Sequence, residues 1–80
     1  MSLLKEHERV VLTTSLQEFQ LEAGDVGTIV HVYADGAAYE VEFVALDGHT
    51  TAVATLERGQ VRPVTSRDMA HSREINATPV

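Results

Sequence analysis

Two alternating segments joined by an Asp-Gly pair constrain the fold of this chain more than any other feature. Residues 26–33, VGTIVHVY, and residues 39–44, YEVEFV, both place apolar side chains at every second position, which is the period of a β-strand. Asp35 and Gly36 stand between them, and both residue types accept the positive φ angles that a tight hairpin turn needs. The segment therefore predicts a β-hairpin whose tip is formed by Asp35 and Gly36.

The second segment of this hairpin predicts which side chains are buried. Tyr39, Val41 and Phe43 are expected to face the core, while the acidic residues Glu40 and Glu42 face water. In the first segment, strict alternation predicts two groups: Val26, Thr28, Val30 and Val32 on one face, and Gly27, Ile29, His31 and Tyr33 on the other. Because a glycine inside a strand has no side chain to pack, Gly27 marks a bulge, a bend or a close backbone approach.

Three further strands are predicted on either side of the hairpin. They cover about residues 9–14, residues 50–56 and residues 60–64, which are rich in β-branched side chains. A second Asp-Gly turn, at Asp47 and Gly48, precedes the middle one of these. Pro63 donates no backbone hydrogen bond, so the last strand should lie at an edge or end there.

A longer connection separates the first two strands. Residues 15–25, SLQEFQLEAGD, contain apolar side chains at Leu16, Phe19 and Leu21, but they lack a good helix cap and run into a turn at Gly24. We therefore predict a long ordered loop that is held against the rest of the domain by its apolar residues.

Five short strands connected by one long loop and then by tight turns define an all-β class. They predict a small, partly open, five-stranded barrel over residues 1–64, since a sandwich would require more strands. The remaining residues, 65–80, are polar with isolated apolar positions. This C-terminal tail is expected to be either disordered or a short helix.

The charge of the chain argues against nucleic-acid binding. Acidic residues outnumber basic ones by 12 to 6, and the net charge is −6. Clustered Lys and Arg side chains provide most nonspecific affinity for nucleic acids through counterion release, and this chain has no such cluster. We expect protein partners instead.

The composition also limits the cellular setting. Cysteine is absent, which excludes disulfide frameworks, thiolate metal sites and thiol nucleophiles. The N-terminal residues lack the apolar core of a signal peptide, and no segment reaches the roughly 20 apolar residues of a membrane helix. We expect a folded cytoplasmic domain with no membrane segment.

The order and spacing of four segments resemble a bacterial family of small proteins, the domain of unknown function four-nine-two-six. These segments are LEAGDVGTIVHVY, AYEVEFV, DGHT and LERGQVRPV, and the resemblance covers about residues 4–64. A GDVGTIV strand like this one also occurs in SH3-like barrels such as the small photosystem I subunit and the nitrile hydratase β-subunit domain. The resemblance implies an SH3-like barrel and, by analogy only, an accessory or assembly role; it implies no activity. Where the family usually has an acidic residue before the valines of its first strand, this chain has Glu8 and then Arg9.

The candidates for chemistry are few. Histidine occurs at four scattered positions, His7, His31, His49 and His71, and no two of them have the spacing of metal ligands on a helix or turn. His31 opposite Glu40 or Glu42 is the one pair of groups that an enzyme or metal site could use. A barrel exterior rarely provides the concave, dry setting that catalytic carboxylates need. We therefore predict no catalytic residue, metal ligand or cofactor.

The function predicted from the sequence is a noncatalytic interaction or assembly module. Its binding surface is expected to comprise Phe19 and Leu21 of the long loop, Tyr33, and the acidic pair Glu40 and Glu42. For Tyr33 and Phe19, packing in the core or the loop is preferred, and a shallow peptide groove between them is the alternative. The partner is a protein, and a second copy of the chain is included because a small core and open sheet edges favour self-association. Alternatives are an antitoxin-like or immunity-like protein that covers a basic partner and, ranked lower, a nucleic-acid-associated or His/Glu metal-binding protein.

Overall fold

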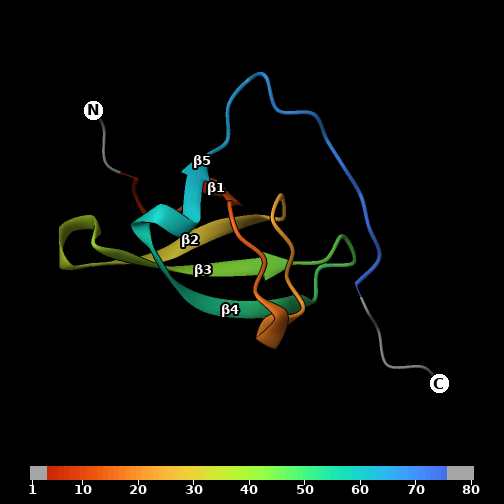
Figure 1. The fold of residues 1–80 in the computed structure, drawn as a ribbon, viewed down its shortest axis with the longest axis horizontal. Coiled ribbons are helices and arrows are strands. Elements are labelled where there is room, and N and C mark those ends of the chain that lie inside the picture. Colours follow the sequence, from red (N-terminus) through yellow and green to blue (C-terminus); the bar gives the residue numbers. More distant parts are fainter. Residues whose placement is uncertain (1–3, 76–80) are drawn as a thin grey trace.

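A single antiparallel sheet organises the chain. The computed structural model describes residues 4–75, and its five strands lie in the order β4-β3-β2-β1-β5 (Figure 1). The strands are β1 (Arg9–Leu12), β2 (Val26–Tyr33), β3 (Ala38–Val44), β4 (Thr50–Glu57) and β5 (Val61–Pro63). Three single 3-10 turns connect them: η1 (Gln17–Phe19), η2 (Ala34–Gly36) and η3 (Arg58–Gln60).

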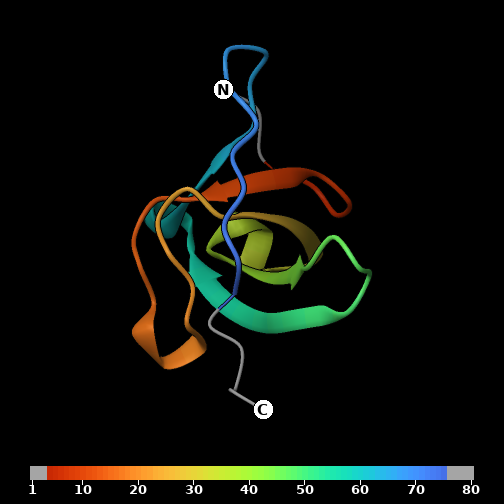
Figure 2. The same ribbon diagram turned by 90° about the vertical axis from the view of Figure 1, so that its right-hand side faces the viewer.

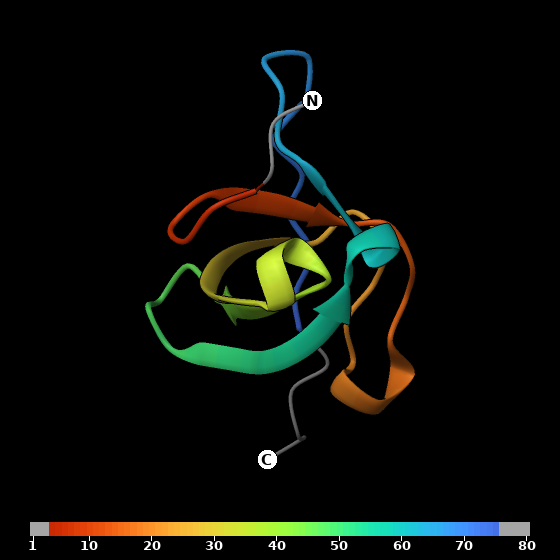
Figure 3. The same ribbon diagram turned by 90° about the vertical axis from the view of Figure 1, so that its left-hand side faces the viewer.

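The sheet curls strongly but does not close (Figures 2 and 3). Its two edges are β4 and β5, and these strands are joined through η3 rather than through a shared ladder. The predicted all-β, five-stranded, partly open barrel is therefore confirmed. β1 ends two residues earlier than predicted, because the backbone and hydroxyl of Thr13 leave the ladder to donate hydrogen bonds to the carbonyls of Gln60 (2.8 Å) and Gly59 (2.9 Å).

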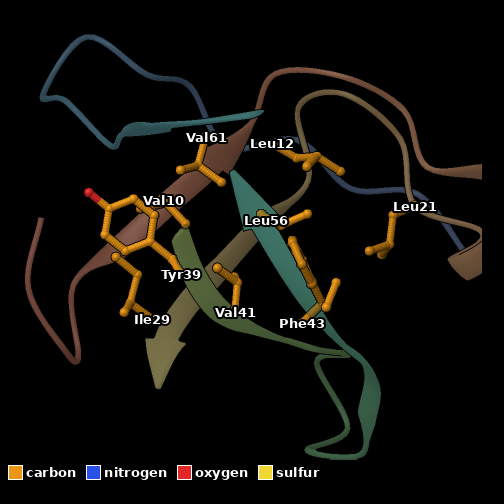
Figure 4. Close-up of a cluster of buried hydrophobic side chains, with 10 residues drawn as sticks. Val10, Leu12, Leu21, Ile29, Tyr39, Val41, Phe43, Leu56 and Val61 are labelled. Carbon is orange, nitrogen blue, oxygen red and sulfur yellow. The ribbon is translucent and has the colours of Figure 1, made fainter. Parts of the chain in front are cut away.

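The concave side of the sheet holds one apolar core (Figure 4). Tyr39, Val41 and Phe43 of β3 are buried as predicted, and they pack with residues from every other strand and from the long loop. The complete cluster consists of Val10, Leu12, Leu21, Ile29, Tyr39, Val41, Phe43, Ala54, Leu56 and Val61. Burial of these side chains is the main source of stability for a chain this short.

A bulge in β2 changes the faces that strict alternation predicts. Ile29 pairs with Val41, but the next pair along β3 joins Glu40 to His31, so Val30 is an extra residue in β2. After the bulge the alternation is reversed, with Val32 packed against the core while Val30, His31 and Tyr33 are exposed. The predicted grouping of His31 and Tyr33 with Ile29 is therefore wrong.

Gly27 marks a close approach between β2 and the core of β3. A Cβ atom at this position would lie 2.6 Å from Cγ1 of Val41, 2.9 Å from Cε1 of Phe43 and 3.0 Å from the carbonyl oxygen of Glu42. These distances are shorter than ordinary van der Waals contacts. Of the three structural reasons predicted for a glycine here, close approach is the one that applies at Gly27, and the bulge lies three residues later at Val30.

The two hairpins turn differently. Ala34, Asp35 and Gly36 all have positive φ angles (47°, 56° and 98°), and Tyr33 pairs with Ala38, so this turn has four residues instead of two. The second turn lies where the sequence predicts it. There, Gly48 has a φ of 92° and the Asp47 carboxylate accepts a 2.9 Å hydrogen bond from the backbone N–H of His49, which lowers the pKa of Asp47.

The long loop between β1 and β2 is ordered as predicted. It contains η1, and Leu16 and Leu21 form an isolated bridge with backbone hydrogen bonds of 2.9 and 3.0 Å in the two directions. Near its end, Gly24 adopts a φ of 99° and donates a 2.7 Å hydrogen bond to the carbonyl of Leu12. The first two bonds join the two sides of the loop to each other, and the third ties the end of the loop to β1.

Over its described part, the C-terminal segment does not form the helix that is one of its two predicted states. Residues 65–75 contain no helix, and the segment begins with a turn in which Asp68 accepts two hydrogen bonds from Arg62 (2.7 and 3.1 Å) and one from the Thr65 N–H (2.7 Å). The segment then runs back along the molecule (Figure 1) until Arg73 reaches Asp25 of the long loop. Residues 76–80 of the predicted tail lie outside the described residues.

We predict that Gly27→Ala lowers the free energy of unfolding by about 1–3 kcal/mol, because the new methyl group overlaps core atoms and the β3 backbone. Urea denaturation of both proteins measures the effect. Gly59→Ala is the matched control, since no atom lies within 4 Å of a Cβ there and the residue has no positive φ angle. Equal denaturation midpoints for the two variants would contradict the close approach.

Candidate functional site

The outward side chains of β2, β3 and β4 form one continuous surface on the sheet. Paired residues on neighbouring strands share a face, so Glu40 lies beside His31 and Thr55, and Glu42 lies beside Thr28 and Val53. We call this surface the outer face and define it by seven residues: Thr28, His31, Tyr33, Glu40, Glu42, Val53 and Thr55. It lies opposite the core, on the convex side of the curled sheet (Figures 2 and 3).

Tyr33, His31 and Glu40 form a small cluster on the outer face. The Tyr33 hydroxyl donates a 2.5 Å hydrogen bond to Oε1 of Glu40, and this bond raises the pKa of the phenol. The His31 ring meets the Tyr33 ring edge-on, with 4.4 Å between centroids and 72° between planes. Nδ1 of His31 lies 3.8 Å from Oε2 of Glu6, so the ring has acidic neighbours on two sides.

Glu42 is held in a similar way. Its Oε2 atom accepts a 2.6 Å hydrogen bond from the Thr50 hydroxyl. Both carboxylates of the acidic pair are thus oriented by neutral hydroxyl groups, and within residues 4–75 neither forms an ion pair with Lys or Arg. Their negative charges are positioned but not neutralised.

The predicted pairing of His31 with an acidic residue occurs in the fold, but it involves only two groups. In the part of the chain that the structure describes, no three His, Cys, Asp or Glu side chains are grouped so that they could hold a metal ion. His49 is the other histidine with an acidic contact, at 3.2 Å between Nδ1 and Oδ2 of Asp47, and it lies in the second hairpin turn. This geometry gives the His/Glu hypothesis no third ligand.

Phe19 and Tyr33 do not form a groove together. Both side chains are partly exposed, at 37% and 38%, but η1 and the end of β2 lie in separate parts of the molecule (Figure 1). The long loop returns to the sheet at Val26, and the strand then extends about 20 Å before Tyr33 is reached. The groove hypothesis is therefore wrong, and Tyr33 belongs with the acidic pair.

Leu21 is a core residue and not part of a binding surface. Only 3% of it is exposed, and it lies with Phe43 and Leu56 at one end of the core (Figure 4). The bridge with Leu16 turns the side chain inward. Its place in the predicted surface is corrected accordingly, while Phe19 stays at the exposed tip of the loop.

The remaining predicted positions lie in turns or in the sheet interior. Gly24, Asp35, Gly36, Asp47 and Gly48 shape connections, and Gly27 permits the close approach described above. The sequence analysis missed Asp25 and Arg73, whose side chains meet although 48 residues separate them. No local pattern signals such a contact, because it depends on the path of the C-terminal segment.

The fold is all-β, with five antiparallel strands in one curled sheet, and it is compatible with the predicted SH3-like, partly open barrel. Residues 6–63 match the model of the family described as Domain of unknown function (DUF4926). The match covers most of the chain, and the protein belongs to this family. No curated protein and no solved structure shows significant similarity to it. Within residues 4–75, no helix has the length and apolar character required to cross a membrane.

We predict that Leu21→Ala lowers the free energy of unfolding by about 2–5 kcal/mol, because it leaves a cavity at the end of the core. Phe19→Ala in the same loop is the control and should change this free energy by no more than about 0.5 kcal/mol, since its side chain is partly exposed. Chemical denaturation provides both values. If Phe19→Ala lowers the free energy of unfolding more than Leu21→Ala does, the assignment of Leu21 to the core is contradicted.

Proposed function

We propose that this protein is a noncatalytic interaction module whose outer face binds a basic surface on a protein partner. The observation that carries the proposal is the state of Glu40 and Glu42. Each carboxylate is oriented by a neutral hydroxyl group, so a cation from a partner can approach it without displacing a Lys or Arg of residues 4–75. Oriented, unneutralised charges favour fast and selective association with surfaces of opposite charge.

The neighbours of the acidic pair support protein binding. Tyr33 and Val53 are exposed at 38% and 44% beside the two carboxylates, and they provide apolar area next to the charges. Exposed aromatic residues such as Tyr33 are enriched among the residues that dominate protein–protein affinity. The net charge of −6 adds a long-range attraction toward a basic partner and opposes binding to nucleic acids.

Several biological roles share this mode of binding. An antitoxin-like or immunity-like protein that covers a basic partner would use the same charges, and so would an accessory protein in an assembly. We place the module in the cytoplasm. Metal-binding and enzymatic roles are ranked lower, because within residues 4–75 His31 and Glu40 are not joined by a third ligating side chain. A nucleic-acid-binding role is ranked lower because the net charge is −6.

The proposal predicts that reversing the two outer charges weakens partner binding. The tagged wild-type protein is used to isolate partners from a lysate of its host at moderate salt, and the bound protein is identified by mass spectrometry and purified. Glu40→Lys combined with Glu42→Lys should weaken its binding about tenfold or more, or by about 1.4 kcal/mol. Calorimetry with the purified partner measures this change.

Glu18→Lys is the control for one such charge reversal and is compared with Glu40→Lys and Glu42→Lys made singly, because it reverses one charge on η1 at an exposed position away from the outer face. Thermal denaturation confirms that the variants remain folded. A partner that binds the outer-face variant and the control equally well would contradict the proposal.

Self-association is a second candidate function, and the free edge of β4 favours it. β4 pairs only with β3 within the described residues, and its first seven residues, TTAVATL, contain neither a charge nor proline. Charged residues and proline usually protect an edge strand against pairing with another chain, and this part of β4 lacks both. We predict a mass above 8.7 kDa for the purified protein in light scattering, rising with concentration; a monomeric mass throughout a wide concentration range would dismiss self-association.

A further inference from the structure

The guanidinium group of Arg73 occupies a notch in the long loop. Its Nε donates a 2.9 Å hydrogen bond to Oδ1 of Asp25, and its Nη2 donates a 2.6 Å bond to Oδ2 of the same carboxylate. Nη2 also donates to the backbone carbonyl of Gln20 at 3.1 Å, and Oε1 of Glu22 lies 3.7 Å from Nε. We call these three acceptors, from Gln20, Glu22 and Asp25, the loop notch.

The loop notch recognises the shape of its occupant as well as its charge. Two parallel N–H···O bonds to one carboxylate match the planar fork of arginine, and a lysine ammonium group cannot form them. The contact is also sheltered, since the side chains of Arg73 and Asp25 are only 22% and 19% exposed. A fully exposed ion pair contributes little to binding or stability. A bidentate pair that is partly shielded from water discriminates better between arginine and lysine.

The loop holds the notch in place through bonds that do not involve the tail. Oδ2 of Asp25 accepts a 2.8 Å bond from the N–H of Glu22, and the Asp25 N–H donates back to the Glu22 carbonyl at 3.0 Å. Gln20 has a φ of 59°, and Ala23 is tied to the Ser15 hydroxyl. Burial of the Asp25 carboxylate acts to raise its pKa, but the bonds from Arg73 and the Glu22 amide outweigh burial, so the pKa of Asp25 lies below its usual value.

The chain that brings Arg73 to the notch is otherwise loosely attached. Between Asp68 and Arg73, residues 69–72 form no hydrogen bond or ion pair with the described part of the chain, and Met69 is 90% exposed. Arg73 is therefore the principal anchor of this segment. Beside it the notch opens into a shallow hollow that is lined by Ser15, Gln17, Gln20, Leu21, Glu22 and Arg73.

We propose that the loop notch is a binding site for an arginine side chain of an extended peptide segment in a protein partner, and that Arg73 occupies it as a competing intramolecular ligand. The proposal rests on the proposed function, because it assigns an arginine to the basic partner of the outer face. The occupant follows from what the notch already holds: a guanidinium group on an extended backbone, with a hollow beside it that can receive neighbouring residues. Release of Arg73 would be required before the partner's arginine could bind.

A peptide titration tests the proposal with the full-length chain. The probe is a synthetic peptide with the sequence of residues 69–75, MAHSREI, and its binding is followed by the NMR amide signals of residues 20–25. We expect saturable shifts with the Arg73→Ala variant, in which the notch is free. The wild-type chain should bind the peptide at least about tenfold more weakly than Arg73→Ala does, because its tethered arginine has a high effective concentration.

Two controls test the chemistry of the notch. A peptide with lysine in place of its arginine should bind the Arg73→Ala variant much more weakly, because it lacks the guanidinium fork. Asp25→Asn added to this variant should abolish the shifts. If the peptide binds the wild type and Arg73→Ala equally well, Arg73 does not compete for the notch. If the peptide does not bind Arg73→Ala, or if the lysine peptide binds this variant as well as the arginine peptide does, the notch is not an arginine site.

The outcome is separable from that of the proposed function. The peptide assay does not involve Glu40 or Glu42, whereas partner binding to the outer face does not require the peptide. If Arg73→Ala leaves the affinity for the purified partner unchanged while the double Glu→Lys variant loses it, the arginine site is overturned and the interaction module stands. If Arg73→Ala raises the affinity for the purified partner, both the arginine site and the interaction module are supported.

Discussion

The close contact between the backbone of β2 at Gly27 and the side chains of Val41 and Phe43 is the constraint on which the rest of the fold depends. Since no Cβ atom separates the strands there, β2 can follow a tight curve across β3 and still pair with β1. The curve encloses the small core and brings the long loop back over its open end, where Leu21 completes the packing. Both surfaces discussed above are consequences of that curvature: the outer face is its convex side, and the loop notch is formed by the loop that returns over the core.

The outer face and the loop notch use acidic groups in different states. Glu40 and Glu42 are oriented by hydroxyl groups and keep their charges available, whereas Asp25 is already paired with Arg73. In the proposed mode of binding, the outer face attracts a basic partner by its charge, and an arginine of that partner would have to displace Arg73 to reach the loop notch.

Much of the fold could be predicted from local sequence. The alternation in residues 26–33 and 38–44 and the turn at Asp47 and Gly48 identify the strands and their connections, because strand period and turn chemistry are local properties. The outward positions of Glu40 and Glu42 follow from the same alternation. The prediction failed where distant parts of the chain decide the outcome.

Leu21, Val30 and Arg73 illustrate three such cases. The apolar residues of the long loop predict that it packs against the domain, but they do not show that Leu21 is buried while Phe19 stays partly exposed. The bulge at Val30 is set by pairing with β3, so alternation alone assigns His31 and Tyr33 to the wrong face. The contact of Arg73 with Asp25 joins residues 48 positions apart, and a polar tail gives no pattern from which it could be derived.

The bulge at Val30 divides β2 into two parts whose side chains have different environments. Before it, Gly27 and Ile29 serve the packing of the barrel; after it, His31 and Tyr33 point outward while Val32 alone keeps contact with the core. Because His31 and Tyr33 do not belong to the core cluster, substitutions at these two positions should leave closure of the sheet intact. If the proposed function is correct, natural selection could change the binding specificity of this strand with little effect on its folding.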